Sequence, residues 1–289
     1  MIEVVATGPL CTVQDGGRRG WAHLGVGHSG AADQPAYALA NRLVGNAVGA
    51  AALECTFGQL HVRVLDACIV ATAGAPCPIV VHGGPPFAHQ QPVALPAGAL
   101  ITLRAPTNGL RTYVAFRGGV DIAGEMGSSS TDVLSGLGPP PLAVGQRLAL
   151  GPDPGTEVPT EIAPLLARST DPIALWPGPR RHWFGDEAAQ LLTSSMYQVE
   201  TDSNRVGVRL RGPALPRSVA EELPSEGLVE GAIQVPADGQ LVVFLADHGT
   251  TGGYPVIAVV DPADLPRIAQ ARPGDRVSFR WLPRGAGRV

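Results

Sequence analysis

Glycine and proline interrupt this chain along its whole length and restrict the folds it can adopt. The 289 residues include 37 glycines and 28 prolines, spread over the whole chain. Glycine weakens helices and proline breaks them, so short strands joined by turns are expected in place of long helices. Hydrophobic residues make up 45% of the chain, which is typical of a globular protein. The composition therefore predicts a mainly β protein with a few short helices.

The chain divides into two halves of similar style, each with many short apolar runs between turn residues. Residues 156–172 are rich in proline, threonine and acidic residues and predict a linker. We therefore expect a first β-barrel domain over residues 1–155 and a second over residues 173–289. Helix patterns occur at residues 33–46 and 186–195. Strands are expected at 2–7, 11–15, 51–57, 60–65, 68–74, 78–83, 99–106, 111–119, 146–151, 173–178, 197–200, 206–212, 232–236, 241–247, 256–260 and 276–281.

Charge and hydropathy exclude several classes of partner. The net charge is −4 and no cluster of basic residues stands out, so a nucleic-acid surface is not expected. The start MIEVV lacks the basic region of a signal peptide. The apolar stretch 67–81 contains two prolines and is too short to cross a bilayer. We expect a soluble cytoplasmic protein that binds neither nucleic acid nor membrane.

All 21 basic residues are arginines, and this absence of lysine excludes several mechanisms. A P-loop, a pyridoxal phosphate enzyme and a biotin carrier each need a lysine amine. Covalent biotin and pyridoxal phosphate are therefore not expected on this chain. The four cysteines show no C-x-x-C spacing and no histidines at ligand spacing, which predicts buried free thiols and no metal site.

The segment TVQDGGRRG, residues 12–20, is the first candidate for binding. Its paired glycines follow a strand end at Asp15, and Arg18 could offer a bidentate fork to a carboxylate or phosphate. The alternative is a tight turn held by an Asp15–Arg18 surface pair, which would stabilise the fold little.

Two further loops could bind an anion or a polar ligand. Ser29 precedes a helix start, where free backbone N–H groups favour an anion, although Asp33 could instead cap that helix. Arg117 precedes two glycines at a strand end and could point into a cleft. The hydroxyl-rich residues 128–131 could bind a polar ligand or only face solvent.

The densest group of polar side chains follows a predicted strand, in DHGTTGGYP at residues 247–255. Gln234 lies on a neighbouring strand, where it should point away from its apolar neighbours. We take three residues as catalytic candidates, namely Asp247, His248 and Tyr254, although a lone histidine also often has a structural role. Expected binding residues in this region are Gln234, Thr250, Thr251, Gly252 and Gly253.

Five segments in this order resemble the KipA family: TVQDGGRRG, ALECTFGQL, RTYVAFRGGVD, SEGLVEGAIQVPADGQ and DHGTTGGYP. The family is also called allophanate hydrolase subunit 2, biotin-dependent carboxyltransferase-like or the C subunit of 5-oxoprolinase. The resemblance runs from about Val4 to Arg280 and implies cyclophilin-like β-barrels. Family members often have arginine and glutamine where this chain has His248 and Gly249, so no role of a cation or an amide is carried over to these positions.

The resemblance implies a subunit of an ATP-dependent enzyme that opens 5-oxoproline to L-glutamate. It implies a KipI-like partner (the B subunit of 5-oxoprolinase), a third subunit similar to LamB/YcsF, and ATP with Mg²⁺ bound by the complex. Phosphorylation of the lactam oxygen would activate the ring for water, and such a step needs cations and N–H groups around the phosphate. Arg18, Arg117 and the glycine-rich turns are the expected cations and donors, whereas Asp247, His248, Thr250 and Tyr254 are expected to hold the lactam.

Two other functions are compatible with the same resemblance. One is a carboxyltransferase component related to urea amidolyase and urea carboxylase, which would need a biotinylated carrier on another polypeptide. The other is a regulator that binds a KipI-like protein without catalysis. True allophanate hydrolysis uses a Ser–Ser–Lys triad, which a chain without lysine does not contain.

Overall fold

The computed structural model describes residues 1–158, 162–165, 169–219 and 221–283. The chain forms two compact units: unit 1 is Met1–Gly20 with Ser29–Ala167, and unit 2 is Trp21–His28 with Arg168–Val289. The main boundary between them falls within the predicted linker 156–172. The short segment 21–28 belongs to unit 2 although it precedes this boundary. The domain limits proposed from the sequence stay a prediction.

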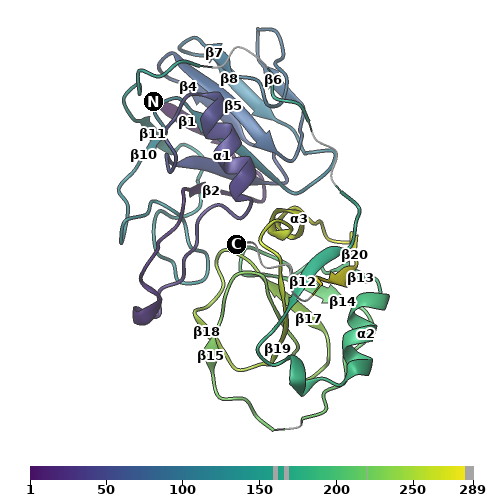
Figure 1. The fold of residues 1–289 in the computed structure, drawn as a ribbon. Helices are drawn as coiled ribbons and strands as arrows, with labels where there is room; N and C mark the ends of the chain where they lie inside the picture. The colour runs from purple at the N-terminus through teal and green to yellow at the C-terminus, as the bar shows by residue number, and fades with distance from the viewer. Residues whose placement is uncertain (159–161, 166–168, 220, 284–289) are drawn as a thin grey trace. The chain divides into compact units, whose positions relative to one another are not determined.

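Unit 1 contains two antiparallel sheets (Figure 1). The first has six strands in the order β10 (Val120–Asp121), β11 (Arg147–Leu150), β1 (Ile2–Ala6), β4 (His61–Val64), β8 (Leu100–Leu103) and β6 (Ile79–Val81). The second has five in the order β2 (Leu10–Gln14), β3 (Ala52–Thr56), β9 (Arg111–Phe116), β5 (Cys68–Gly74) and β7 (Val93–Leu95).

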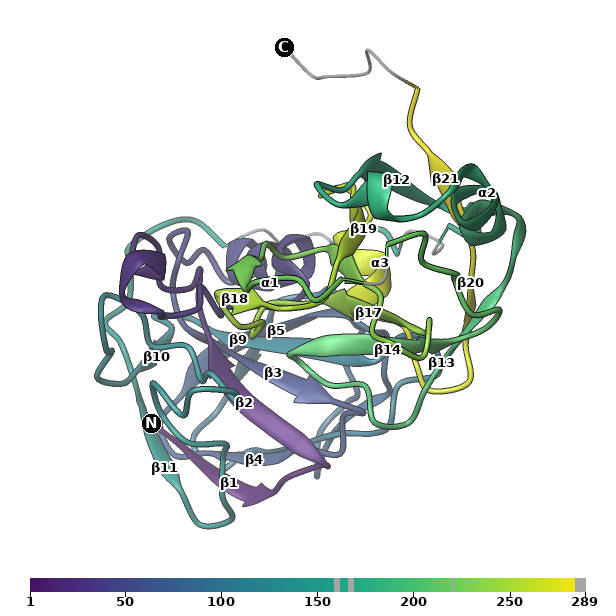
Figure 2. The ribbon, with the colours of Figure 1, turned by 90° about the horizontal axis from the view of Figure 1, so that it is seen from below.

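The core of unit 1 lies between these two sheets. Side chains alternate along each strand, so Val114 and Phe116 of β9 enter this core together with Val62 of β4. The other face of β9 carries Tyr113 and Ala115, which pack against the helix α1 (Gln34–Leu43). Figure 2 shows α1 on one side of β5 and β9, with β1 and β4 on the other side.

The start of α1 is fixed by polar contacts that the sequence partly predicts. The Asp33 carboxylate accepts a hydrogen bond from the Ala36 N–H at 3.0 Å, which confirms the expected cap. The Asp33 N–H in turn donates to the Tyr113 hydroxyl at 2.8 Å, and this hydroxyl donates to the buried Glu54 at 2.7 Å. A capping carboxylate therefore occupies the helix end that was also considered as an anion site.

Unit 2 is built on an eight-stranded sheet. Its order is β20 (Arg276–Val277), β13 (Tyr197–Val199), β14 (Gly207–Arg211), β17 (Leu241–Phe244), β16 (Ala232–Gln234), β19 (Val256–Val260), β12 (Ile173–Pro177) and β21 (Phe279–Trp281). The two edge strands, β20 and β21, are separated in the chain by Ser278 alone. The sheet must therefore curl until its edges meet, which makes it a nearly closed barrel.

The remaining elements of unit 2 are short. A two-stranded ribbon pairs β15 (Glu226–Gly227) with β18 (Thr251–Gly252). The helices are α2 (Asp186–Ser194) and α3 (Leu265–Ala269), and single 3₁₀ turns occur at η1 (Ala22–Leu24) and η2 (Arg181–Trp183). The Trp281 indole N–H donates to the Ala189 carbonyl at 3.3 Å, which ties α2 to β21.

The mainly β architecture with short helices is confirmed, and each of the predicted strand segments contains a strand. Ser278 interrupts the last of them and divides it into β20 and β21. The sequence patterns missed α3 and four strands of two or three residues, namely β7, β10, β15 and β18. Such short elements are too brief to show a hydrophobic period.

Three further findings concern the cysteines, possible metal ligands and membrane-spanning helices. The four cysteines are free thiols; Cys11, Cys55 and Cys77 are buried and Cys68 is half-buried. Within the described residues, no group of three or more His, Cys, Asp or Glu side chains could hold a metal ion. No helix in the same part of the chain is long and apolar enough to span a membrane.

Candidate functional site

In unit 1, the carboxylate of Asp15 is held at the end of β2 by four hydrogen bonds. Its Oδ1 accepts from the hydroxyls of Ser128 and Ser130, at 2.6 and 2.5 Å, and from the Gly17 N–H at 2.8 Å. Its Oδ2 accepts from the Ser129 N–H at 2.6 Å. The hydroxyl-rich loop is therefore not simply solvated, because two of its hydroxyls bind Asp15.

These contacts set the charge of Asp15. Burial alone would raise its pKa, but the hydrogen bonds from Ser128, Ser130, Gly17 and Ser129 outweigh burial and place the pKa below the ordinary value of 3.8. Asp15 is therefore a fixed anion at neutral pH. It holds the turn 15–18 and the loop 128–130 together, so its immediate role is to position both.

Replacing Asp15 by asparagine should lower the free energy of unfolding by about 2 kcal/mol at pH 7, because an amide N–H₂ would face donors that now meet a carboxylate oxygen. The lowered pKa gives stability that is present above the unfolded-state value and is lost as the pH falls through the folded-state value. The difference between wild type and D15N should therefore shrink below about pH 4. Urea unfolding at several pH values measures it. The exposed Asp121, changed to asparagine, is the control, and an equal loss there would contradict the role given to Asp15.

Arg18 lies close to Asp15 and is the most unusual side chain of unit 1. It is 1% exposed, and its Nη2 donates to the carbonyl oxygen of Ser130. Among the described residues, its Nε and Nη1 are buried without a hydrogen-bond partner. A buried guanidinium with two unused N–H groups is costly in a folded protein unless a ligand or water completes it. An oxyanion or a water would complete Nε and Nη1, and ligand binding at Arg18 stays a prediction from the sequence.

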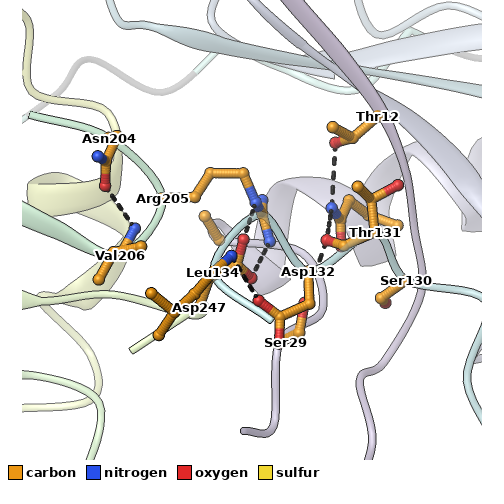
Figure 3. Close-up of polar contacts among 12 residues, drawn as sticks. Thr12, Ser29, Ser130, Thr131, Asp132, Leu134, Asn204, Arg205, Val206 and Asp247 are labelled. Atoms are coloured by element: carbon orange, nitrogen blue, oxygen red, sulfur yellow. Dashed lines mark hydrogen bonds and ion pairs between the residues drawn. The ribbon is translucent and has the colours of Figure 1, made fainter. Parts of the chain in front are cut away.

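Other polar atoms around Arg18 are also incomplete. The Thr131 carbonyl accepts from the Ser29 hydroxyl at 3.2 Å (Figure 3). The same carbonyl accepts from the Gln14 amide at 2.9 Å. In the described part of the chain, Gln14 Oε1 and Thr131 Oγ1 have no hydrogen-bond partner. Gln14, Arg18, Ser29 and Thr131 thus gather on one loop cluster, which we call the Arg18 cluster.

Gly30 allows this cluster to form. Its φ of +92° favours glycine, and a β-carbon there would come within 2.9 Å of the Gly17 nitrogen. Ser29, at φ 51°, also adopts the left-handed region that most residues avoid. The loop that precedes α1 is therefore pressed against the turn 16–17 that follows β2.

Arg117 lies elsewhere in unit 1 and is held by protein groups. Its Nη1 donates to the Val44 carbonyl at 3.0 Å, and its Nη2 donates to the Thr156 carbonyl at 2.7 Å. Nη2 also lies 2.6 Å from the Asp153 carboxylate. These contacts attach the segment 153–156 to the ends of α1 and β9. The structure thus favours a clamping role for Arg117 over the ligand contact proposed from the sequence.

In unit 2, a cavity of about 370 Å³ lies on the barrel wall beside β14, β16 and β17. Its lining includes two residues proposed from the sequence, Gln234 and Tyr254, together with Phe244 and Gly207. The volume lies within the range of small-molecule sites. Gln234 is 4% exposed and its amide N–H₂ donates to the Tyr254 carbonyl at 2.9 Å. Tyr254 itself is 49% exposed, and the Arg217 guanidinium lies 6.0 Å from the centre of its ring.

The paired glycines of DHGTTGGYP have different surroundings. A β-carbon at Gly252 would lie 2.6 Å from Gln234 Nε2 and 2.8 Å from a Leu228 methyl group, whereas one at Gly253 would meet nothing closer than 3.6 Å. Gly252 therefore lets the backbone pass close to Gln234, a neighbour within the protein. Thr251 pairs with Gly227 in the ribbon, and the Thr250 carbonyl accepts from the Leu228 N–H at 2.9 Å.

Replacing Gly252 by alanine should lower the free energy of unfolding by about 1–3 kcal/mol, since the new methyl group overlaps Gln234 and Leu228. It should also displace the Gln234 amide that lines the cavity. Gly253→Ala is the matched control, with an expected change within about 0.5 kcal/mol. Urea unfolding followed by tryptophan fluorescence compares the two. Equal losses for both variants would contradict this account of Gly252.

Asp247, the first catalytic candidate, is already engaged in an ion pair. The guanidinium of Arg205 donates to both of its oxygens, Nε to Oδ2 at 2.8 Å and Nη2 to Oδ1 at 2.9 Å, and both residues are 1% exposed (Figure 3). The Asp247 N–H also donates to the Arg205 carbonyl at 3.0 Å. This pair fixes the segment that follows β17, so Asp247 is better suited to positioning than to accepting a proton.

His248 and Glu230 are the groups of unit 2 best suited to proton transfer. Nδ1 of His248 lies 2.7 Å from the Gly249 carbonyl, which only accepts, so Nδ1 carries the proton and Nε2 is the basic nitrogen of the neutral ring. The ring packs against Phe244, which lines the cavity. Burial raises the pKa of Glu230 to about 7, partly opposed by Arg205 and reinforced by Asp247.

Sequence reasoning missed Arg205 and Glu230. Arg205 begins a strand-like run without any motif of its own, so only its distance from Asp247 shows its importance. Glu230 lies in the segment SEGLVEGAIQVPADGQ, but burial gives it its unusual pKa and the sequence pattern does not reveal that burial. The structure thus brings Gln234 and Tyr254 together at one cavity and packs Gly252 against Gln234. It places Asp247 and His248 just after β17.

Comparisons with known proteins agree on one relationship. Residues 24–281 match the family described as carboxyltransferase domain, subdomain A and B. The C subunit of 5-oxoprolinase from Escherichia coli (strain K12) is 38% identical over 282 residues, covering 96% of this chain and 90% of that protein.

Two solved structures are similar over nearly the whole chain. TTHA0988 superposes with a TM-score of 0.88 and 35% identity, covering 96% of this chain and 55% of its own. Kluyveromyces lactis urea carboxylase superposes with a TM-score of 0.90 and 29% identity, covering 98% of this chain and 27% of its own. The chain therefore spans about half of TTHA0988 and about a quarter of the urea carboxylase.

Proposed function

Since this chain belongs to the family of the carboxyltransferase domain, subdomain A and B, we propose that it is the C subunit of an ATP-dependent 5-oxoprolinase complex. The complex would open 5-oxoproline to L-glutamate. The observation that carries the proposal is the 38% identity to the C subunit of E. coli 5-oxoprolinase, which extends over 96% of this chain and 90% of that protein.

The Arg18 cluster supplies a receptor for an anionic group of the reactants. Nε and Nη1 of Arg18 have no hydrogen-bond partner among the described residues, and each can donate a charge-assisted hydrogen bond to an oxygen of a carboxylate or phosphate. Asp15 keeps the neighbouring turn in place through Gly17 and the loop 128–130. We infer that Arg18 binds either the substrate carboxylate or a phosphate of the nucleotide.

The cavity of unit 2 supplies groups that recognise a neutral amide. Gln234 and Tyr254 line it, and an amide or phenol side chain can donate to a lactam carbonyl or accept from its N–H. Opening the ring adds water across the C–N bond, so the nitrogen must gain a proton while water loses one. We assign this proton transfer to Glu230, whose pKa burial raises to about 7, or to Nε2 of His248, which the hydrogen bond from Nδ1 to the Gly249 carbonyl leaves as a proton acceptor.

The described residues match only some of the groups that binding of ATP with Mg²⁺ requires. Arg18 is suited to a phosphate oxygen, but the described residues contain no set of acidic, histidine or cysteine side chains for a metal. We therefore assign no Mg²⁺ ligand to this chain. ATP would supply the phosphoryl group that activates the lactam oxygen, and the role derived for this chain is to hold the anion and to move a proton.

The same proposal requires other polypeptides. We propose as partners a KipI-like protein, which is the B subunit of 5-oxoprolinase, and a third LamB/YcsF-like subunit. The E. coli relative is named as the C subunit of its enzyme, and this name supports an assembly with several subunits.

A carboxyltransferase role is the second candidate. The TM-score of 0.90 with K. lactis urea carboxylase favours it, and the matched family carries the same term in its description. In this role the chain would act on carboxybiotin bound to another polypeptide, since it has no lysine to biotinylate.

Reconstitution separates these roles. The chain is mixed with the KipI-like and LamB/YcsF-like subunits of the same organism, and ADP release is followed with 5-oxoproline, with urea plus a carboxybiotin carrier, or with neither. We expect ADP only with 5-oxoproline, and none when this chain is omitted. Urea-dependent loss of carboxybiotin would favour the second role. Stable binding to the KipI-like protein, without turnover of either substrate, would contradict a catalytic role and favour a regulatory one.

A further inference from the structure

A second cavity lies in unit 1, on the outer face of the six-stranded sheet, and the proposed function makes no use of it. Its volume is about 450 Å³. The polar side chains that line it are Thr7, Gln59, His61, His82, Thr102 and Arg104. None of them belongs to the Arg18 cluster, which lies at the end of β2 in the other sheet.

The strand register sets these side chains side by side. His61 of β4 pairs with Thr102 of β8, while their neighbours Val62 and Ile101 are buried in the core of unit 1. Because side chains alternate along a strand, His61 and Thr102 both point outward. The Nε2 of His82, which follows β6, lies 2.9 Å from the Thr102 hydroxyl. Three adjacent strands thus deliver two imidazoles and a hydroxyl to one surface.

The backbone that leads into Gln59, one of the lining residues, is unusual. Three consecutive residues, Phe57, Gly58 and Gln59, have φ of 58°, 63° and 59°, a left-handed conformation that residues other than glycine seldom adopt. A β-carbon at Gly8 would overlap the Gly58 carbonyl, and one at Gly58 would overlap the Arg104 carbonyl. Three segments are therefore pressed together behind Gln59 and Arg104. Backbone strain of this kind persists only where the surroundings hold it, and it gathers at functional sites.

The charge of the lining points to the chemistry of the ligand. Among the described residues, its ionisable side chains are His61, His82 and Arg104, and none of these lining residues is a carboxylate. This is notable in a chain whose net charge is −4. The Thr102 hydroxyl and the Gln59 amide add uncharged donors. A guanidinium together with imidazole and hydroxyl donors on one cavity suits the binding of carboxylate or phosphate oxygens.

We propose that this cavity is a second binding site, separate from the Arg18 cluster, for a small molecule that carries a carboxylate or phosphate group. His61, His82 and Arg104 contact the oxyanion, and the left-handed turn 57–59 holds Gln59 at the rim. The proposal does not depend on the 5-oxoprolinase role, since it uses no residue assigned to that reaction.

The test uses inorganic phosphate and succinate as probes on the full chain. Because Arg18 is also expected to bind anions, the readout must be local, so the imidazole C–H signals of His61 and His82 are followed by NMR. H61Q and H82Q variants assign these signals among the seven histidines. We expect one of the two anions to shift both signals saturably, and the dissociation constant to rise at least about tenfold in Arg104→Gln, which removes a charge-assisted hydrogen bond.

Arg147→Gln is the matched control, because Arg147 lies on β11 of the same sheet, is 65% exposed and does not line the cavity. Its dissociation constant should stay within about twofold of wild type. Absence of a saturable shift with both anions would overturn the proposal. So would equal weakening by Arg104→Gln and Arg147→Gln, which would indicate attraction to the general charge of the sheet. A response to phosphate alone or succinate alone supports the proposal and identifies which oxyanion the site takes.

Discussion

Replacing Arg205 by methionine is expected to lower the free energy of unfolding of unit 2 by about 3–5 kcal/mol. The guanidinium of Arg205 meets both oxygens of Asp247, at 2.8 and 2.9 Å, and both residues are 1% exposed. Without Arg205, a carboxylate remains buried with its main cationic partner removed. Removing one partner of a buried ion pair lowers the free energy of unfolding by more than the intact pair contributes to it, because the other charge stays buried without compensation.

Urea unfolding at pH 7 measures this loss, and tryptophan fluorescence makes the measurement local. The four tryptophans, Trp21, Trp176, Trp183 and Trp281, all belong to unit 2. Arg211→Met is the control, because the pair of Arg211 with Glu200 is solvent-exposed and should contribute less than about 1 kcal/mol. The double variant R205M/D247L should recover much of the loss. Equal losses of stability in R205M and R211M would contradict the claim that loss of Arg205 from its buried pair destabilises unit 2 more than loss of Arg211 from its exposed pair.

Arg18→Met is expected to reduce 5-oxoproline-dependent ATP hydrolysis by the reconstituted complex at least about 100-fold. The same change should leave the stability of the chain unchanged or increase it. Arg18 is buried with two N–H groups that lack a partner among the described residues, so folding gains little from its charge. A side chain that the reaction needs and the fold does not need is the signature of a binding role.

Two measurements are therefore compared, the rate of ADP release and the calorimetric unfolding temperature. Arg19→Met is the matched control: Arg19 is the next residue, it is exposed, and its loss should alter neither quantity. A large drop in unfolding temperature for Arg18→Met would make Arg18 a structural residue. Full activity in Arg18→Met would show that Arg18 is not needed for substrate or nucleotide binding.

Local patterns were sufficient to predict most of the fold. The helix α1 begins at a predicted Asp33 cap, and the alternation in segments such as CIVATAG predicted β5. Short elements failed because two or three residues show no period, as in β15 and β18. The assignment of residues 21–28 to unit 2 depends on tertiary contacts that no local pattern encodes.

The site was harder to predict because its chemistry depends on partners distant in the sequence. Asp15 and Arg18 were proposed together from their spacing, but their shared support comes from Ser130, more than a hundred residues away. Asp247 stood out as a polar residue after a strand, yet its ion pair with Arg205 changes its expected role from reaction to positioning. Arg117 looked similar to Arg18 in the sequence, and only its contacts with Val44 and Thr156 distinguish the two.

The most direct test of the proposed function is the amount of L-glutamate formed when all three subunits are mixed with 5-oxoproline and ATP. The complete mixture should form one glutamate for each ADP released. The mixture that lacks this chain should form none above background. Equal glutamate with and without this chain would contradict its assignment as a working subunit of the enzyme.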